Sequence, residues 1–407
     1  MTMNDLERDV CSRIAAWRQR MVDELTAWVA IPTGRGHASG LHGQRAALAH
    51  RLRQLGAVTR DITCERRPDW IDPPWESTHA ADGVDILAAE HAGAGPRLLL
   101  SGHFDTVHDP HGSFRELRSI GGGRATGPGA ADMKGGLVIA LAALEAIRDA
   151  GHPLAWTFVL VPDEETGSYG SAAALRSLAP GHAAGFVFEP AGEGDSLIVE
   201  RMGAAQFRID AFGRAVHVGR DYAKGCSAVR ALCESVGRAE ALADPAAGRI
   251  VNIGPLQGGA VTNIVPDHAS AWGNMRFASG AEEAHIASGL DALACGADGE
   301  VPRVRVRQIA GRPAKPLTPE VERLAQLVRG ASEDLGRPLP FGRTGGVCDG
   351  NNLQAAGLPT LDTLGVRGGN LHREDEWVDL DGMVDRAQLV ALSLLRTAAS
   401  VASTMRA

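Results

Sequence analysis

The chain has 407 residues, of which 44% are hydrophobic, and its formal net charge is −8. A single hydrophobic core rarely serves more than about 250–300 residues, so this length predicts two domains. Nucleic-acid binding is excluded because it needs clustered Lys and Arg, and the chain has no basic block. A membrane span is excluded because no stretch approaches the ~18–20 consecutive apolar residues that it requires.

The first two hundred residues alternate between helix and strand patterns. Apolar residues at helical spacing predict a helix over residues 5–30, which Pro32 closes. The other predicted elements are helices near 43–55, 135–149 and 169–178, and strands at 84–89, 97–102, 155–162 and 184–189. Such alternation is typical of an α/β layer with a mixed, largely parallel sheet flanked by helices. Residues 63–82, rich in Pro and Trp, predict a long surface loop.

The pattern changes at residue 203. Strands at 204–212, 249–257, 267–277 and 302–309 and helices at 227–242 and 281–294 form a β-α-β-β-α-β series, which predicts a ferredoxin-like α+β domain. Helices near 318–335, 346–356 and 380–402 and a strand near 359–363 follow it. We therefore expect a catalytic domain in two parts, 1–202 and 311–407, with a smaller domain inserted at 203–310.

The compartment is predicted from the N-terminus and the cysteines. The first residues have no basic stretch followed by an apolar run, so they do not predict a signal peptide. The six cysteines are scattered without metal-ligand spacing, which favours free thiols over a disulfide framework. Both features favour the cytoplasm.

Two polar side chains end the apolar run Leu98-Leu-Leu-Ser-Gly-His-Phe-Asp. Residues two apart on a strand face the same side, so His103 could bind a metal while Asp105 accepts its other ring N–H. A strand-end histidine can also be a capped surface residue. Further along, Asp132 lies in a glycine-rich turn before an apolar helix. An aspartate at this place is usually an N-cap, and only the preceding histidine motif favours a metal ligand.

Three consecutive acids, Asp163, Glu164 and Glu165, follow the predicted strand 155–162. A divalent cation would relieve their mutual repulsion, although a solvated acidic turn is the alternative. One glutamate can bind the metal while its neighbour acts as base toward a water that the metal activates.

Glu189 ends another apolar strand, and His372 comes from the segment Gly369-Asn-Leu-His. The carboxyl ends of parallel strands meet at one edge of a sheet, where such folds hold their sites. Two histidines and three acids form a mixed nitrogen and oxygen ligand set that suits zinc. The set is large enough for a two-metal centre.

Eight motifs occur in order over roughly residues 10–400: GHFDTV, GPGAADMKGG, PDEETGS, FEP, GRAVHVG, VTNIVPDHA, GGVCDGN and NLH. In this series the chain resembles the co-catalytic zinc aminoacylase and carboxypeptidase family. That family includes glutamate carboxypeptidase of the G type, acetylornithine deacetylase and succinyl-diaminopimelate desuccinylase.

The resemblance implies roles for the matching positions. His103, Asp132 and Glu189 would hold one of two divalent metal ions, with Asp132 bridging to a second ion that Glu165 and His372 complete. Zinc is expected, and manganese or cobalt would also fit such ligands. Glu164 would be the general base and Asp105 would orient His103. The bond between Asp132 and Met133 would be a cis peptide.

For the inserted domain the resemblance implies a lid that also forms a homodimer. His217 would stabilise the tetrahedral intermediate, often from the partner subunit; as a residue on its own it is an ordinary strand-end histidine. Asn263 and Arg276 would receive a substrate carboxylate, to which a guanidinium fork is suited. The chain departs from the family pattern at three places that bear on the substrate: Val218, Asn274 and Cys348.

These features predict a hydrolase that cleaves an amide-type C–N bond of a small carboxylate-bearing substrate, closest to the G-type carboxypeptidases. A deacylase of N-acyl amino acids and a hydrolytic deaminase of an aromatic amine would share every metal ligand, so the ligands do not separate these activities. A non-catalytic binding relative would have lost ligands or the base, and both are present here.

Overall fold

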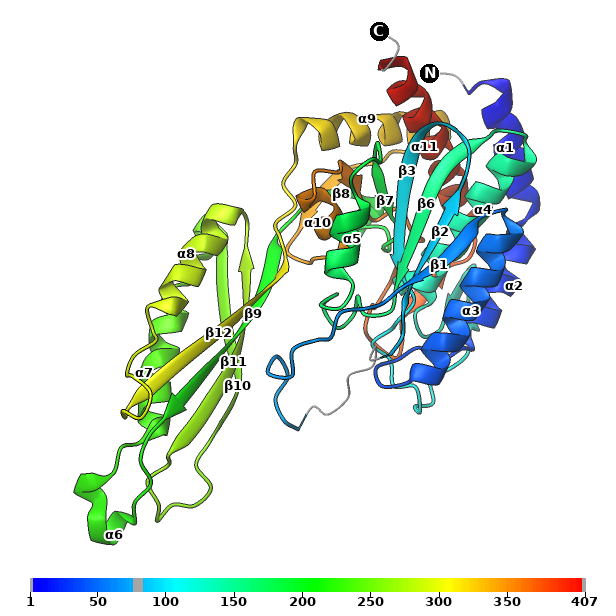
Figure 1. The fold of residues 1–407 in the computed structure, drawn as a ribbon. Helices are drawn as coiled ribbons and strands as arrows, with labels where there is room; N and C mark the ends of the chain where they lie inside the picture. Colours follow the sequence, from blue (N-terminus) through cyan, green and yellow to red (C-terminus); the bar gives the residue numbers. More distant parts are fainter. Residues whose placement is uncertain (1–2, 76–82, 405–407) are drawn as a thin grey trace.

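The computed structural model describes residues 3–75 and 83–404. Figure 1 shows a larger part with helices around a sheet and a smaller part that projects from it. The smaller part has its own hydrophobic core, formed by residues between Ala205 and Val304. The boundaries at 202/203 and 310/311 stay predictions. Within the described residues, no helix has the length and apolar character needed to cross a membrane.

The sheet of the larger part has the strand order β1-β2-β6-β3-β7-β14. Its strands are β1 (Val58–Ile62), β2 (Ile86–His91), β6 (Leu154–Val161), β3 (Ala94–His103), β7 (Gly185–Val187) and β14 (Thr360–Leu361). The last four run parallel, and β1 and β2 are antiparallel to their neighbours. Every residue of β6 is buried, as expected for a strand covered on both faces. The predicted mixed, largely parallel sheet is confirmed.

Alternate residues of the strands contact helices on opposite faces of this sheet. Leu98 and Leu100 belong to one core and Leu99, between them, to another. The first core includes residues of α1 (Asp5–Ala16), α2 (Arg18–Val29), α3 (Ala38–Gln54), α4 (Gly136–Asp149), α9 (Pro319–Asp334) and α11 (Met383–Thr404). The second includes residues of α5 (Ala172–Leu178) and α10 (Asp349–Ala355).

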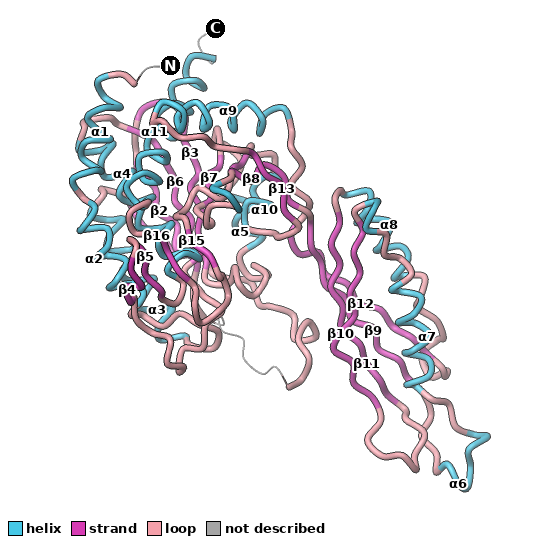
Figure 2. The backbone as a smooth tube through the Cα atoms, turned by 180° about the vertical axis from the view of Figure 1, so that it is seen from behind, coloured by secondary structure: helices cyan, strands magenta, loops and turns pink. Residues whose placement is uncertain are grey.

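The smaller part has the ferredoxin-like arrangement that the sequence predicts. Its elements are β9 (Gly203–Phe212), α7 (Ala228–Glu240), β10 (Arg249–Gly258), β11 (His268–Phe277), α8 (Gly280–Asp291) and β12 (Arg303–Arg312). The strand order is β10-β11-β9-β12, with every pair antiparallel. Figure 2 shows both helices on one face of this sheet. A short helix, α6 (Val218–Asp221), lies at the far end.

The predicted loop at 63–82 lies partly outside the described residues. Its described portion reaches the sheet of the smaller part, where the carbonyl of Trp70 accepts a hydrogen bond from Trp272 at 3.0 Å. Trp75 also contacts the Trp272 ring edge-on. Trp272 belongs to β11 but not to the core beneath α7 and α8, so the loop covers the face of the sheet that lacks helices.

Several short strands are absent from the prediction. β4 (Arg118–Gly121), β5 (Arg124–Thr126), β15 (Gly368–Gly369) and β16 (Trp377–Asp379) form a second four-stranded sheet. β8 (Leu197–Arg201) pairs in parallel with β13 (Phe341–Thr344). Strands of two to five residues carry too little periodicity to stand out from loops.

Candidate metal centre

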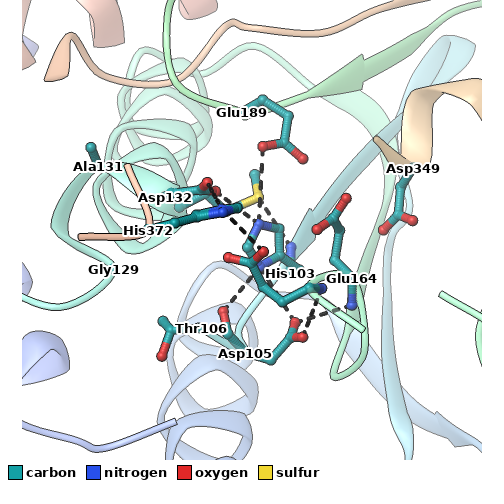
Figure 3. Close-up of polar contacts among 12 residues, drawn as sticks. His103, Asp105, Thr106, Gly129, Ala131, Asp132, Glu164, Glu189, Asp349 and His372 are labelled. Carbon is teal, nitrogen blue, oxygen red and sulfur yellow. Dashed lines mark hydrogen bonds and ion pairs between the residues drawn. The ribbon is translucent and has the colours of Figure 1, made fainter. Parts of the chain in front are cut away.

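The predicted ligands come together at the carboxyl edge of the large sheet (Figure 3). His103 ends β3, and the acidic turn and Glu189 follow the neighbouring strands β6 and β7. Asp132 comes from the turn Ala130–Gly135 before α4, and His372 from the loop between β15 and β16. The peptide bond between Asp132 and Met133 is cis, as the resemblance implies.

Asp132 lies between the two histidines. Its Oδ1 is 3.1 Å from Nε2 of His103, and its Oδ2 is 3.4 Å from Nε2 of His372. The same His372 nitrogen is 3.3 Å from Oε2 of Glu165, and Nε2 of His103 is 4.0 Å from Oε2 of Glu189. Each oxygen of Asp132 therefore faces a different histidine, and each histidine has a different glutamate nearby, which is the arrangement expected of a bridging ligand.

The carboxylates of this cluster are buried close together, and the positive charges around them are too few to balance their negative charge. Burial and the negative charge of Asp132 raise the pKa of Glu165 to about 8 and that of Glu189 well above its usual range. Oε1 of Glu189 is buried and has no hydrogen-bond partner within the described residues. Donor atoms of His103, Asp132 and Glu165 lie within 4.8 Å of one another, as do those of His103, Glu164 and Glu189. This donor set fits divalent cations.

His103 is fully enclosed, and Asp105 fixes its orientation. Burial alone would lower the pKa of His103, but its contacts with Asp105 and Asp132 raise it well above the usual value. Nδ1 lies 3.0 Å from the carbonyl oxygen of Asp105 and 3.4 Å from its Oδ1. The Asp105 carboxylate also accepts from the backbone N–H groups of Glu164 and Glu165, at 3.2 and 2.9 Å. One side chain thus positions a ligand and the acidic turn.

His372 differs from His103 in exposure, because its side chain is 54% exposed. Its hydrogen bonds to Asp132 and Glu165 raise its pKa to about 11. The residue has a positive φ of 64°, a conformation that is uncommon outside glycine. The loop thus turns this histidine toward the cluster from the solvent side.

Glu376 is a positioning residue that the sequence does not single out. Its buried carboxylate accepts from the backbone N–H groups of Gly129, Ala131 and Asp132, at 3.2, 2.8 and 3.1 Å. It also contacts Nε2 of His108 at 2.6 Å. The acidic run after His372 is the only signal of it in the sequence.

Glu164 contacts a second buried network that the sequence does not predict. Its Oε1 is 2.8 Å from Nη2 of Arg312, the last residue of β12. The same nitrogen donates to Oγ of Ser168 at 2.7 Å, and that hydroxyl donates to Asp349 at 2.5 Å. Burial and the charge of Glu164 raise the pKa of Asp349 to about 7, although Arg312 lowers it. Arg312, from the sheet of the smaller part, therefore contacts Glu164, the predicted base in the larger part.

A cleft of about 1250 Å³ lies over the cluster and reaches the small sheet. Arg276 lines it together with Asn274, whose Oδ1 accepts from Nε of Arg276 at 3.1 Å. Nη1 of Arg276 is buried without a hydrogen bond to any described residue. Asn274, a departure from the family pattern, thus orients the predicted carboxylate ligand.

His217 and Asn263 do not line this cleft in the single chain. Both are exposed near α6, where the N–H of Val218 donates to the carbonyl of Asn263 at 3.0 Å. The side chain of His217 accepts from the N–H of Gly219. Cys348 is buried next to the cleft residue Val347, and burial raises the pKa of its thiol well above the usual value. All six cysteines are free.

Comparison with known proteins shows to which family the chain belongs. Residues 99–396 match the sequence model of peptidase family M20/M25/M40. The chain belongs to this family. It is 27% identical to carboxypeptidase G2 of Pseudomonas sp. (strain RS-16) over 379 residues, which cover 91% of this chain and 88% of that protein. It is 28% identical to succinyl-diaminopimelate desuccinylase 2 of Shewanella loihica over 371 residues, which cover 82% and 94%.

Solved structures agree in fold. A metallo-carboxypeptidase of the M20 family from Sulfolobus solfataricus superposes with a TM-score of 0.72 at 13% identity, covering 93% of this chain and 99% of that one. Aminopeptidase PepT of Bacillus cereus gives a TM-score of 0.71 at 21% identity and covers 94% and 99%. The family that the motifs predict is confirmed, and this M20 member is a metal-dependent hydrolase of amide-type C–N bonds.

Proposed function

We propose that this M20 enzyme is carboxypeptidase-like and releases an amino acid from a small N-acyl or peptide-like substrate with a free carboxylate. His103, Asp132 and Glu189 would hold one divalent metal ion, and Asp132, Glu165 and His372 a second. The observation that carries this assignment is the position of Asp132, whose two oxygens face different histidines at 3.1 and 3.4 Å. Resemblance to carboxypeptidase G2 over 91% of the chain favours the carboxypeptidase activity.

Zinc is the proposed metal because two imidazoles and three carboxylates form a mixed ligand set; manganese and cobalt are the alternatives. Such ions, when bound, polarise a carbonyl oxygen and acidify water. Burial raises the pKa values of Glu165 and Glu189, so a bound cation would stabilise their ionised forms.

Glu164 is the proposed general base. Its donor atoms lie within 4.8 Å of those of His103 and Glu189, so its carboxylate borders the proposed metal site. The ion pair with Arg312 at 2.8 Å and the bond from its own N–H to Asp105 fix its direction. In this role Glu164 takes a proton from the attacking water and returns it to the leaving amine.

Arg276, oriented by Asn274, would bind the substrate carboxylate with the nitrogen that has no partner. We further propose that His217 and Asn263 act in the cleft of a second copy, because they are exposed away from their own. Six of the eleven exposed large hydrophobic residues in the described chain belong to the smaller part, including Ile250 and Leu256 on its edge strand β10. Such a concentration supports a homodimer through this part.

A deacylase of N-acyl amino acids is the second candidate. It is favoured by the similarity to succinyl-diaminopimelate desuccinylase 2, of which the match covers 94%. Both activities use the same ligands and base, so substrates must separate them. Location in the cytoplasm stays a prediction.

The test is Glu164→Gln, assayed on N-acyl amino acids and dipeptides with zinc, manganese and cobalt supplied separately. We expect metal content equal to that of the wild type and turnover reduced at least about 100-fold, because the variant keeps the shape but cannot accept the proton. Glu193→Gln is the control, since Glu193 is an exposed acid at the edge of the same cleft. A Glu164→Gln protein that binds metal and retains near-normal turnover would contradict the assignment.

A further inference from the structure

A segment of the larger part that follows β1, residues 65–75, reaches the sheet of the smaller part (Figure 1). We call this segment the strap. The two chain connections between the parts lie together at another place, because Ala204 is opposite Arg312 on the neighbouring strands β9 and β12. A body that is attached at one end can rotate about that end, as hinged domains do. A second contact away from the connections would restrict the rotation.

The strap contacts the small sheet in one row of residues, roughly 13 Å along the strands from these connections. Trp272 on β11, Arg208 on β9 and Arg307 on β12 are opposite one another in this row. Nε1 of Trp272 donates to the carbonyl of Trp70 at 3.0 Å, and the Arg307 guanidinium lies 5.3 Å from the centre of the Trp70 ring. The ring of Trp75 meets that of Trp272 edge-on at 5.8 Å. Both kinds of ring contact are attractive, so they bind the strap to the smaller part.

The strap is also bound to the acidic turn of the proposed metal centre. Nη1 of Arg67 donates to the carbonyl of Thr166, the residue that follows Glu165. Nη2 of Arg67 is 2.7 Å from Oδ1 of Asp72, and the other oxygen of Asp72 is 3.3 Å from Nη2 of Arg35. The side chains of Arg67 and Asp72 are only 14% and 10% exposed, and both line the cleft. The ion pairs therefore hold the strap against the larger part.

The strap thus links the acidic turn with the face of β11 that borders the cleft. Trp272, Asn274 and Arg276 alternate along β11, so they face the same side of the sheet, away from the core beneath the helices. Arg276 is the proposed ligand of the substrate carboxylate, and Glu165 is a proposed metal ligand. A rotation of the smaller part would change the distance between these two groups, because the guanidinium lies at the end of a long side chain.

We propose that the strap positions Arg276 relative to the acidic turn and so restricts substrates to one spacing between the carboxylate and the scissile amide. This inference rests on the proposed function and narrows its substrate class. For a carboxypeptidase-like hydrolase the spacing is that of an α-amino acid, in which one carbon separates the two groups. A β-amino acid would place its carboxylate away from Arg276 when the amide lies at the metal centre. Trp70, Trp272 and Asp72 are positioning residues in this role.

Two variants weaken the strap at opposite ends. Trp272→Phe keeps a ring but removes the N–H that binds Trp70, and Asp72→Asn removes the charge that holds two arginines of the cleft. Asp69→Asn, which alters a 72% exposed acid of the strap, is the matched control for charge. Trp156→Phe, at a buried tryptophan of β6, is the matched control for ring size.

N-benzoyl-alanine and N-benzoyl-β-alanine are isomers that differ in the spacing between the carboxylate and the amide. We expect the wild type and both controls to favour the α isomer at least about tenfold in kcat/KM, because displaced groups react slowly. Each strap variant should lower this ratio about 3- to 10-fold, as for the loss of one hydrogen bond. The change should appear in KM, since a displaced Arg276 binds the substrate more weakly. Damage to the acidic turn would instead lower kcat for both isomers equally.

Calorimetric titration of metal-loaded Glu164→Gln protein with the two isomers tests the strap without turnover. Tighter binding of the α isomer, reduced when Trp272→Phe or Asp72→Asn is added, supports the strap even if the wild type hydrolyses neither isomer. In that case only the proposed function fails. A protein with the native strap that does not discriminate between the isomers overturns the inference. Strap variants that keep the isomer ratio within about twofold, in kcat/KM and in affinity, overturn it as well.

Discussion

The carboxylate of Glu376 contacts three backbone N–H groups of the turn that carries Asp132. Gly129 precedes that turn in a left-handed conformation, and the Glu376 carboxylate binds the N–H groups at its start. Asp105 holds the acidic turn in a similar way, because its carboxylate accepts from the backbone N–H groups of Glu164 and Glu165. Residues that bind no metal in the proposal thus determine where the ligands lie.

Glu376→Gln tests this positioning role. The amide can replace only one of the two accepting oxygens, so we expect metal affinity to fall about 10- to 100-fold, as for other groups that orient metal ligands. Competition of the protein with a zinc-binding dye measures the affinity. Glu374→Gln removes an exposed acid two residues away and should leave it unchanged. Equal affinities of wild type and Glu376→Gln would show that the turn holds itself.

The sequence reveals some residues of the site and misses others, depending on whether a local sequence pattern marks them. His103, Asp132, Glu165, Glu189 and His372 follow strands or glycine-rich turns, so local patterns reveal them. Glu376 and Arg312 act through side chains from distant segments, and nothing local gives them a role. Asp349 lies in the motif GGVCDGN, but the motif alone does not show that it joins the network of Glu164. His217 and Asn263 are recognisable in motifs, but their separation from the cleft appears only in three dimensions.

The N-terminal segment is helical, as its apolar spacing predicts, but the predicted boundaries of the helix are wrong. The predicted helix over 5–30 is two helices that meet at Trp17, whose N–H bonds to the carbonyl of Ile14, three residues back. No Pro or Gly marks this break, and the apolar spacing continues across it. The ferredoxin-like series was predictable because long amphipathic elements repeat in it, whereas β8 and β13 are too short to predict.

The face of the small sheet without helices depends on Asp210. This carboxylate accepts from Arg208, Ser270 and Arg307 at 2.8, 2.6 and 2.7 Å. Burial would raise the pKa of Asp210, but the hydrogen bonds from Ser270 and Arg307 and the charge of Arg208 lower it below its ordinary value of 3.8. A carboxylate whose pKa is lower in the folded state stabilises it above the ordinary value.

Asp210→Asn should therefore lower the free energy of unfolding by about 1–3 kcal/mol at pH 7. The wild type should lose this advantage as the pH falls below 3.8, and the two proteins should become more alike. Thermal unfolding between pH 7 and pH 3 measures the difference. Asp298→Asn, which alters a 96% exposed acid of the same part, is the control. A difference that does not depend on pH would exclude the charge as its cause.

In the whole molecule, the proposed catalytic residues are divided between the larger and the smaller part. The proposed metal ligands lie in the larger part, whereas Arg276 and Arg312 line the same cleft from the smaller part and Arg312 contacts Glu164. His217 and Asn263 remain at the far end of the smaller part, near α6 (Figure 1). The proposal requires a second copy to supply them.

Mixing two inactive variants tests that requirement. His217→Ala and Glu164→Gln each disable a different component, and a mixed dimer contains one site with both components intact. Random exchange of subunits should restore about a quarter of the wild-type rate, since half of the dimers are mixed and each has one working site. Sedimentation confirms that dimers form and exchange. Mixtures that stay inactive despite exchange would assign His217 to its own subunit.

The strands β9 and β12, which begin and end the smaller part, are neighbours, with Ala204 opposite Arg312. The two connections to the larger part therefore leave from one place, and a turn of about two residues would be enough to join them. Recombination between relatives could exchange this segment as a cassette. A recipient would acquire a new Arg276 and Arg312 with it, but it would keep its own His103, Asp132 and His372, which lie outside the exchanged segment. The proposed carboxylate ligand and the proposed metal ligands can thus be inherited separately, so chimeras could combine the substrate preference of one parent with the metal centre of another.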